Sequence, residues 1–391
     1  MYYVQRAVTI LSLLVLAAAS WRSIQLARAD AAFRHRSPAE VARAIEIVPE
    51  NSAYLATLAL QGEYSGQDST ALVKDVLEDI AALNPRSPAP RIRLGLAAEL
   101  RGDNVTAERW LQEAFSVDRQ FETRWTLANF YFRQERSDEF WKWMRSALEM
   151  SYGDRGVAFD LCWQMTADAN EILTRAIPGN HDVIASYLVY ILSKHRQEAI
   201  AGAANRLASV RAPDDLPLLY AATDVLLENG QTSAAADVWQ ALGNARPQGV
   251  THSDFEAPRI GHGFDWRFAE PSGVTYLPIE APAAQRIKFS GQQPESTELL
   301  RQVLGGLHTG VSYTLHWDAR TQGIASPTGL EWKIAGRAAP VIPGENWSTS
   351  QMVFTADSDH PILVLTYRRP EGQVRTQGQV DLKRVFTSSP E

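Results

Sequence analysis

The side chains best suited to acid–base chemistry gather shortly after residue 250 of this sequence. His252, Ser253 and Asp254 are consecutive, and His262 and Asp265 follow within a few positions. Consecutive residues cannot form a Ser-His-Asp triad with one another, because the groups of a triad are assembled in space. His262 and Asp265 can approach each other, but such pairs are common in loops that have no catalytic role. The spacing therefore predicts no catalytic residue.

The sequence also lacks the signatures of cofactor-dependent and metal-dependent enzymes. It contains no phosphate-binding glycine loop, no dinucleotide-binding glycine pattern and no His-Glu-x-x-His motif. Asp214 and Asp215 stand at the start of an expected helix, where the helix dipole stabilises negative charge. We therefore expect no cofactor, and we expect that the chain is not an enzyme.

Tryptophan side chains offer a different chemistry, because sugar rings stack on exposed aromatic faces while neighbouring polar groups bind the hydroxyls. Trp347 lies in the loop-like segment PGENWSTSQ and is the candidate for exposure, with a role as a loop anchor as the alternative. Trp141 and Trp143 lie two residues apart on one expected helix and cannot both face the same core. We expect one of them to face solvent or a partner, the alternative being burial between helices. The candidate ligand-binding residues are thus Trp141, Trp143 and Trp347.

Length, charge and cysteine content limit the other functions. The chain has 391 residues, a net charge of -7 and an isoelectric point near 5.7. A nucleic-acid-binding protein usually carries a basic face, so we expect no nucleic-acid partner. The single cysteine, Cys162, leaves no internal disulfide and no thiolate-rich zinc site. It lies in the apolar run AFDLCW, which predicts a buried side chain.

An uncharged, mostly apolar run extends from Ala7 to Trp21, directly after Arg6. Two interpretations stay open: a signal peptide that is cleaved near Ala17, or an uncleaved anchor whose helix continues to Ala29. We favour the anchor and assign it to residues 1–30, because no turn-forming residue follows the apolar run. The arginines after the run oppose export by the positive-inside rule, although long downstream domains can override that bias. We expect an inner-membrane anchor and a periplasmic body.

Residues 31–247 show helical periodicity, most clearly between Pro85 and Arg119. This stretch reads as two amphipathic helices joined by a tight turn at Gly102 and Asp103. The residues that pack the two helices together are a small–large–small stripe on the second helix and a Leu-Gly pair on the first. They are Leu94, Gly95, Gly102, Ala107, Leu111 and Ala114.

The same spacing recurs at the end of the helical region, in Gly230, Ala235, Trp239 and Leu242. The Pro85–Arg119 hairpin resembles one complete tetratricopeptide repeat, and the resemblance implies an array of five or six units, some of them degenerate. The repeat register is lost between Tyr152 and Pro178, where we expect two short helices. Arrays of this family offer a concave groove, which implies a protein partner on the helical repeats.

After residue 247 the helical pattern gives way to short alternating runs bounded by Gly and Pro. In SYTLHWDA, Tyr313, Leu315 and Trp317 alternate with polar residues, as in a strand with one face in the core. Eight or more such runs predict an antiparallel β-sandwich over residues 248–391.

The order of these runs resembles a jelly-roll carbohydrate-binding module. The features that carry the resemblance are Phe255 and Glu256 in the opening segment and the strand Gly310–Leu315. Members of that family often have paired aspartates near the end of the last strand, which help to hold a structural calcium. Lys383 and Arg384 occupy those positions here, so the resemblance implies that this chain binds no metal.

The sequence therefore predicts an N-terminal membrane helix, a tetratricopeptide-like helical solenoid and a jelly-roll sandwich. The predicted function is a non-catalytic, membrane-anchored scaffold: the helical repeats bind a protein, and the sandwich binds a glycan or a second protein. Cell-envelope or exopolysaccharide assembly is the process that this combination suggests. The alternative is a carbohydrate-active enzyme, or its accessory subunit, with an active site in the sandwich.

Overall fold

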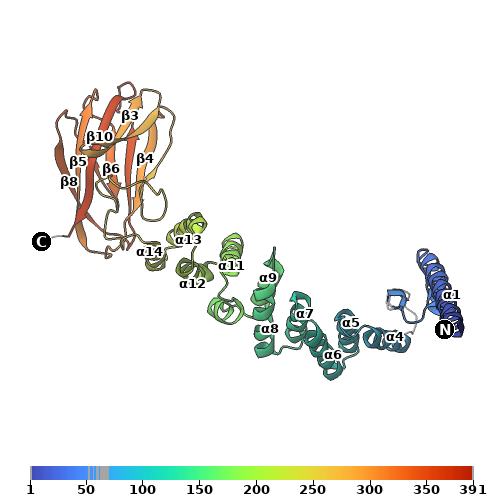
Figure 1. Ribbon diagram of the computed structural model, residues 1–391. Helices are drawn as coiled ribbons and strands as arrows, with labels where there is room; N and C mark the ends of the chain where they lie inside the picture. The colour runs from blue at the N-terminus through green and yellow to red at the C-terminus, as the bar shows by residue number, and fades with distance from the viewer. Residues whose placement is uncertain (1, 52, 56, 59–60, 62–69, 390–391) are drawn as a thin grey trace. The chain divides into compact units, whose positions relative to one another are not determined.

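Helices occupy the first part of the chain and strands the last part in the computed structural model, which describes residues 2–51, 53–55, 57–58, 61 and 70–389 (Figure 1). The chain divides into two compact units, Met1–Ala167 and Asp168–Glu391. The first unit is helical, whereas the second combines the last helices with all the strands.

The first unit opens on a long apolar helix, α1 (Tyr2–Phe33). Its stretch Thr9–Phe33 is long and apolar enough to cross a membrane, judged by length and composition. The helix continues beyond the apolar run, and near its end Ala29 and Ala32 pack against α2 (Pro38–Ile47) and Tyr54. The predicted apolar N-terminal helix is therefore present, and its C-terminal turns pack against other residues of the first unit.

The helices that follow pair into antiparallel hairpins. The remaining labelled helices of the first unit are α4 (Thr70–Leu83), α5 (Ala89–Leu100), α6 (Asn104–Val117), α7 (Phe121–Arg133), α8 (Ser137–Met150) and α9 (Gly156–Met165). Those of the second unit are α10 (Ala169–Glu171), η1 (Ile172–Ala176), α11 (His181–Ser193), α12 (Gln197–Ser209), η2 (Pro213–Asp215), α13 (Leu216–Glu228) and α14 (Thr232–Ala241). The two short helices expected between Tyr152 and Pro178 are present as α9 and the α10–η1 pair.

Four of these hairpins, α5–α6, α7–α8, α11–α12 and α13–α14, close with the same three-residue turn. The middle residue of each turn has a positive φ: Gly102 at 79°, Glu135 at 55°, His195 at 54° and Gly230 at 71°. The next residue donates its N–H to a carbonyl five positions earlier, as Asp103 does to Ala98 at 3.0 Å. This bond caps the first helix of each hairpin. Two of the four turns therefore place a non-glycine residue in the left-handed conformation.

Gly95 shows why the hairpins need small residues. A Cβ atom added to Gly95 would lie 2.7 Å from the side chain of Leu111 on the partner helix. The helices of α5–α6 thus approach closely at this point, and Leu111 fills the space that the missing side chain leaves.

The strands of the second unit form two five-stranded antiparallel sheets that lie face to face (Figure 1). The first sheet has the order β1-β4-β9-β6-β7 and the second the order β2-β3-β10-β5-β8. Their bounds are β1 (Arg267–Phe268), β2 (Val274–Glu280), β3 (Ala283–Ser290), β4 (Ser296–Val303), β5 (Ser312–Gln322), β6 (Leu330–Ile334), β7 (Arg337–Pro340), β8 (Ser348–Thr355), β9 (Ile362–Arg368) and β10 (Gln377–Ser388).

From β3 onward the chain crosses repeatedly between the two sheets, which is the connectivity of a jelly roll. Alternate residues of each strand enter the core between the sheets, and Trp266, Trp317 and Trp332 are buried there. The predicted fold class, a tetratricopeptide-like helical region followed by a jelly-roll sandwich, is confirmed.

The last hairpin packs against the segment that leads into β1. The Trp239 ring of α14 meets the Phe264 ring edge to face, with their centroids 6.0 Å apart. On α13, the Asp224 carboxylate accepts hydrogen bonds from the Gly263 N–H at 2.7 Å and from an Arg267 Nη at 2.6 Å. Apolar and charged contacts therefore join α13–α14 to the sandwich within the second unit.

Candidate ligand-binding face

The second sheet has one side in the core and one side open to solvent, because successive residues of a strand point in opposite directions. We call its solvent-facing side the polar face. Its members, read from the strand registers, include Thr275, Leu277, Arg286, Lys288, His316, Asp318, Arg320, Gln322, Thr349, Gln351, Gln379 and Asp381. Most of these side chains can form hydrogen bonds, whereas Leu277, Val353 and Phe386 on the same side are apolar.

Strand register arranges part of the polar face in rows that cross the sheet. In one row, Lys288 of β3 lies opposite both Thr275 of β2 and Gln379 of β10, and Gln379 lies opposite Gln322 of β5. The two amides bond to each other, with Gln379 Nε2 donating to Gln322 Oε1 at 3.0 Å. This row places an ammonium, a hydroxyl and two amides side by side on the surface.

The next row centres on Asp381, whose side chain is only 2% exposed. Arg286 donates from Nε and Nη2 to the two carboxylate oxygens, at 2.7 and 2.9 Å. Arg320 donates from Nε to one of the same oxygens at 2.9 Å. One buried carboxylate therefore holds two guanidinium groups in fixed positions on the polar face.

The pKa of Asp381 is lowered by this arrangement. Burial acts to raise the pKa, but the hydrogen bonds and charges of Arg286 and Arg320 outweigh burial. Asp381 in turn raises the pKa of Arg286. The carboxylate is thus ionised at neutral pH, and its charge is more than balanced by the two arginines.

Two adjoining pockets open on the polar face and share Gln322 and Gln379 as a common wall. One has a volume of about 580 Å³ and is lined also by Thr275, Lys288 and Ser290. The other, of about 250 Å³, is lined by Arg286, Arg320, Thr321, Glu345 and Asp381 in addition to the shared amides. The two rows of side chains therefore line two neighbouring pockets, which we together call the hollow.

Trp347, a candidate ligand-binding residue from sequence, lies just before β8 and is half-buried. The guanidinium carbon of Arg320 is 4.7 Å from the centre of its ring, so the two side chains form a cation–π contact. Trp347 thus borders the hollow, next to the second row of the polar face, with part of its surface accessible.

Trp141 and Trp143, the other candidates, are both buried in α8, with exposed fractions of 2% and 6%. The Trp143 ring packs edge to face against Phe115 of α6 at 4.6 Å, whereas Trp141 packs against Phe140 at 4.7 Å. The expectation that one of them faces solvent is wrong, because neighbouring side chains cover both sides of α8. Neither ring is available to a ligand in this structure.

The predicted repeat-packing residues lie in the helical hairpins. Gly102 and Gly230 form the turns, and Gly95 is the site of close helix approach. The remaining members are all buried: Leu94, Ala107, Leu111, Ala114, Ala235, Trp239 and Leu242. Trp239 differs from its counterpart Leu111, because its ring also contacts the segment before β1.

The histidines and aspartates singled out after residue 250 have structural partners. Asp265 is buried and binds His252 Nδ1 at 2.8 Å, while it also accepts the N–H of Gly261 at 3.0 Å. His262 can approach Asp265 by its place in the sequence, but its Nδ1 bonds to Asp224 of α13 at 2.7 Å. The side chains of His262 and Asp265 therefore do not pair: Asp265 bonds to His252, and His262 bonds to Asp224, which is distant in sequence.

His252 gives a testable pH dependence. The hydrogen bond to Asp265 raises the pKa of His252 above its ordinary value of 6.5. A raised pKa stabilises the fold below the unfolded-state pKa, and that stabilisation disappears as the pH rises through the folded-state value. We expect His252→Gln to cost about 1 kcal/mol more near pH 5.5 than near pH 9, since charge-assisted hydrogen bonds are the stronger ones.

Urea unfolding of the wild type and His252→Gln at several pH values measures this difference, with the exposed His308→Gln as the control. A difference in unfolding free energy that stays constant from pH 5.5 to 9 would contradict the assigned ion pair.

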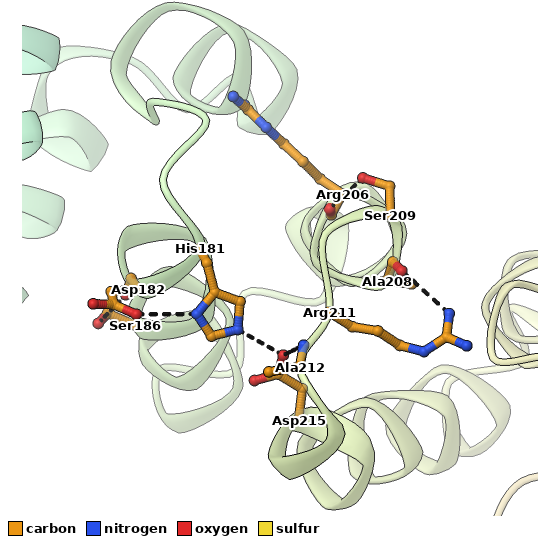
Figure 2. A network of polar contacts seen from close by, with 9 residues as sticks. All are labelled: His181, Asp182, Ser186, Arg206, Ala208, Ser209, Arg211, Ala212 and Asp215. Carbon is orange, nitrogen blue, oxygen red and sulfur yellow. Dashed lines mark hydrogen bonds and ion pairs between the residues drawn. The ribbon is translucent and has the colours of Figure 1, made fainter.

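A further histidine, His181, links the starts of two helices (Figure 2). At the start of α11, its Nδ1 lies 3.0 Å from Asp182, and its Nε2 lies 2.7 Å from Asp215. Asp215 also accepts the N–H of Ala212 at 2.7 Å, which fixes the turn before α13. Hydrogen bonds raise the pKa of His181, and the bond to Asp182 contributes more than the bond to Asp215. These groups hold helices together and leave no free acid–base pair at this site.

Within the described ranges, no group of three or more His, Cys, Asp or Glu side chains is arranged to hold a metal ion. At the predicted position of the missing aspartates, Lys383 and Arg384 lie on β10 beside a β-bulge. Cys162 is buried, and burial raises the pKa of its thiol well above the usual range.

Sequence reasoning missed the central residues of the hollow, Arg286, Arg320 and Asp381. Alternation in QRIKFSG and QVDLKRVF is a sufficient signal to place Arg286 and Asp381 on the open side of their strands. Their pairing requires the register between strands that lie 95 residues apart in the chain, which no local pattern supplies.

No protein-family model matches the chain, and no curated protein does. Among solved structures, the sandwich is similar to a module described as "CBM4 structure and function", with 15% identity, coverage of 36% of this chain and 99% of that one, and a TM-score of 0.29. It is also similar to a CBM61 module solved with β-1,4-galactotriose, with 14% identity, coverage of 37% and 100%, and a TM-score of 0.27.

The helical region is similar to part of the APC/C hetero-tetramer Cut9–Hcn1. The identity is 13%, the match covers 58% of this chain and 41% of that one, and the TM-score is 0.28. Likenesses of this size carry no conclusion about what the chain binds.

Proposed function

We propose that the protein is a non-catalytic binding protein whose polar face takes up a glycan. The observation that carries this proposal is the pair of neighbouring pockets, with the Thr275–Lys288–Gln379–Gln322 row on one side and Arg286, Asp381 and Arg320 on the other. Planar amides, guanidinium groups and hydroxyls at fixed spacing suit the neighbouring hydroxyls of a sugar chain. Trp347 at the border adds a ring face on which a sugar can stack.

The helical hairpins are proposed to bind a protein partner. Exposed apolar side chains on the hairpins of the first unit support this role, including Leu96 and Leu100 on α5 and Phe121 at the start of α7. Phe121 also stacks on Trp125, one turn along the same helix. Apolar groups that stay exposed on a packed helical array are suited to bury against another chain.

The apolar helix α1 is proposed to anchor the protein in the inner membrane, with the body in the periplasm. Its length, composition and continuation past the apolar run support an anchor over a cleaved leader. An anchored protein that binds both a protein and a glycan suits a role in cell-envelope or exopolysaccharide assembly.

The proposal is tested by presenting the full-length chain, solubilised in detergent, to a glycan array and then incubating it with each glycan that binds. Reversible binding without released product is the expected result. Released product would identify a carbohydrate-active enzyme instead. Failure of the folded protein to bind any glycan would overturn the glycan-binding role.

Substitutions in the shared wall of the two pockets test where the glycan binds. Replacing both Gln322 and Gln379 with alanine is expected to weaken glycan binding roughly thirtyfold, since two hydrogen bonds are lost and each contributes ~1 kcal/mol. Calorimetric titration of the full chain measures the affinity. Gln351→Ala is the matched control, because Gln351 lies on the same polar face opposite His316 but outside both pockets. Equal affinities for the double variant and Gln351→Ala would place the glycan elsewhere.

A further inference from the structure

The hollow on the polar face carries an excess of positive charge, although the whole chain has a net charge of -7. Its cationic wall residues are Arg286, Lys288 and Arg320, and its carboxylates are Asp381 and Glu345. Asp381 is buried between the two arginines and is fully engaged by them. The lining of the hollow is therefore positive, although the protein as a whole is acidic.

Arg320 has hydrogen-bond donors that its contact with Asp381 does not use. Arg286 meets Asp381 with two nitrogens, but Arg320 uses only Nε. Its two terminal nitrogens have no hydrogen-bond acceptor within the described part of the chain, and its guanidinium is held in place by the Trp347 ring. A guanidinium fixed at its inner edge and open at its outer edge is suited to receive a carboxylate with two parallel hydrogen bonds.

Lys288 supplies a second free cation in the same hollow. Its side chain is exposed, and within the described residues no carboxylate lies within ion-pair distance of it. It stands two strands and one row from Arg320, which corresponds to ~10 Å across the sheet and ~7 Å along the strands. One small anion does not reach both groups, whereas a chain with repeated acidic groups does.

We infer that the glycan taken up by the polar face is acidic, with one uronic-acid carboxylate bound at Arg320 and a second acidic sugar near Lys288. This inference rests on the proposed glycan-binding function and names the class of glycan. Gln379, on the strand between the two cations, and Gln322, two residues from Arg320 on β5, then bind the hydroxyls of the intervening sugar.

The test compares a polyuronate with the same polymer after chemical reduction of its carboxyl groups, using the detergent-solubilised full chain and calorimetric titration. We expect the acidic form to bind roughly tenfold or more tightly, because hydrogen bonds to a charged acceptor are the stronger ones. Added salt should reduce this preference. Polyglutamate, which has carboxylates but no sugar rings, should bind no better than the reduced polymer.

Lys288→Gln tests the second cation without disturbing the Asp381 group. It is expected to weaken binding of the polyuronate about threefold to fivefold, as for the loss of an exposed ion pair, and to weaken binding of the reduced polymer less, because glutamine keeps a hydrogen-bond donor at this position. Lys333→Gln is the control, because Lys333 is an exposed lysine on β6 of the other sheet. A larger loss of polyuronate affinity for Lys288→Gln than for Lys333→Gln supports the assignment of Lys288 to the binding site.

The outcomes separate this inference from the proposed function. Equal binding of the polyuronate and its reduced form would overturn the acidic preference while the glycan-binding role stands. Equal affinities for polyuronate and polyglutamate would show that charge attraction, and not recognition of sugar rings, accounts for binding. That result would overturn both the acidic-glycan inference and the proposed glycan-binding function. No binding of either polymer, together with an array on which no glycan binds, would also overturn both.

Discussion

Replacing Asp381 with alanine is expected to destabilise the sandwich by roughly 2–4 kcal/mol. The change leaves the guanidinium groups of Arg286 and Arg320 side by side without the buried carboxylate between them. Breaking a buried ion pair by removing one partner typically costs ~3–5 kcal/mol. The lower range applies here, because both arginines retain partial access to water. Denaturant unfolding of the full chain measures the loss.

The control for this change is Asp318→Ala. Asp318 also lies on the polar face and accepts a hydrogen bond from the Thr349 hydroxyl at 2.7 Å, so its removal is expected to cost about 1 kcal/mol. Equal costs for the two alanine variants would contradict a central role of Asp381.

The destabilisation should also depend on pH in a defined direction. The pKa of Asp381 is lowered in the folded state, so its contribution is present above the unfolded-state value of 3.8. It is lost as the pH falls through the lower folded-state pKa. The difference between wild type and Asp381→Ala should therefore be constant from pH 5 to 8 and shrink in strong acid.

Replacing Trp239 with alanine is expected to cost about 3–5 kcal/mol and to lower the melting temperature of the second unit by roughly 10 °C. Trp239 is fully buried and contacts the rings of Tyr220 and Phe264. A Cβ atom added to Gly263 would lie 2.7 Å from the Trp239 ring, so the surrounding packing is tight. The substitution opens a cavity where α13–α14 meet the segment before β1.

Thermal unfolding of the full chain, followed by near-ultraviolet circular dichroism, measures this effect. Tyr152→Ala is the control for the loss of an aromatic ring, because Tyr152 is almost fully exposed. A melting temperature for Trp239→Ala within about 1 °C of the control would show that this contact contributes little.

The helical part of the fold could be predicted because its determinants are local. The spacing of Ala107, Leu111 and Ala114 and the turn at Gly102 identify one hairpin within a short stretch of sequence. The turns at Glu135 and His195 adopt the same left-handed conformation without glycine. Propensity alone does not predict them, because hydrogen bonding of the closing turn selects the conformation.

The orientation of single side chains was harder to predict than the elements that carry them. The spacing of Trp141 and Trp143 predicts one buried and one exposed ring, whereas both rings are buried in α8. On the polar face, the direction of each side chain can be predicted, but its neighbours cannot. Each strand's alternation marks which residues point outward, but only pairing between distant strands brings Arg286, Asp381 and Arg320 together.

The central claim, that the polar face binds the glycan, is tested most directly by hydroxyl-radical footprinting of the full chain with and without a bound glycan. Leu277 on the polar face and Ile362 on the open side of the other sheet form a matched pair, with exposed fractions of 40% and 41%. We predict that the glycan protects Leu277 and Trp347 from oxidation and leaves Ile362 unchanged. Protection of Ile362 without protection of Leu277 and Trp347 would contradict the account.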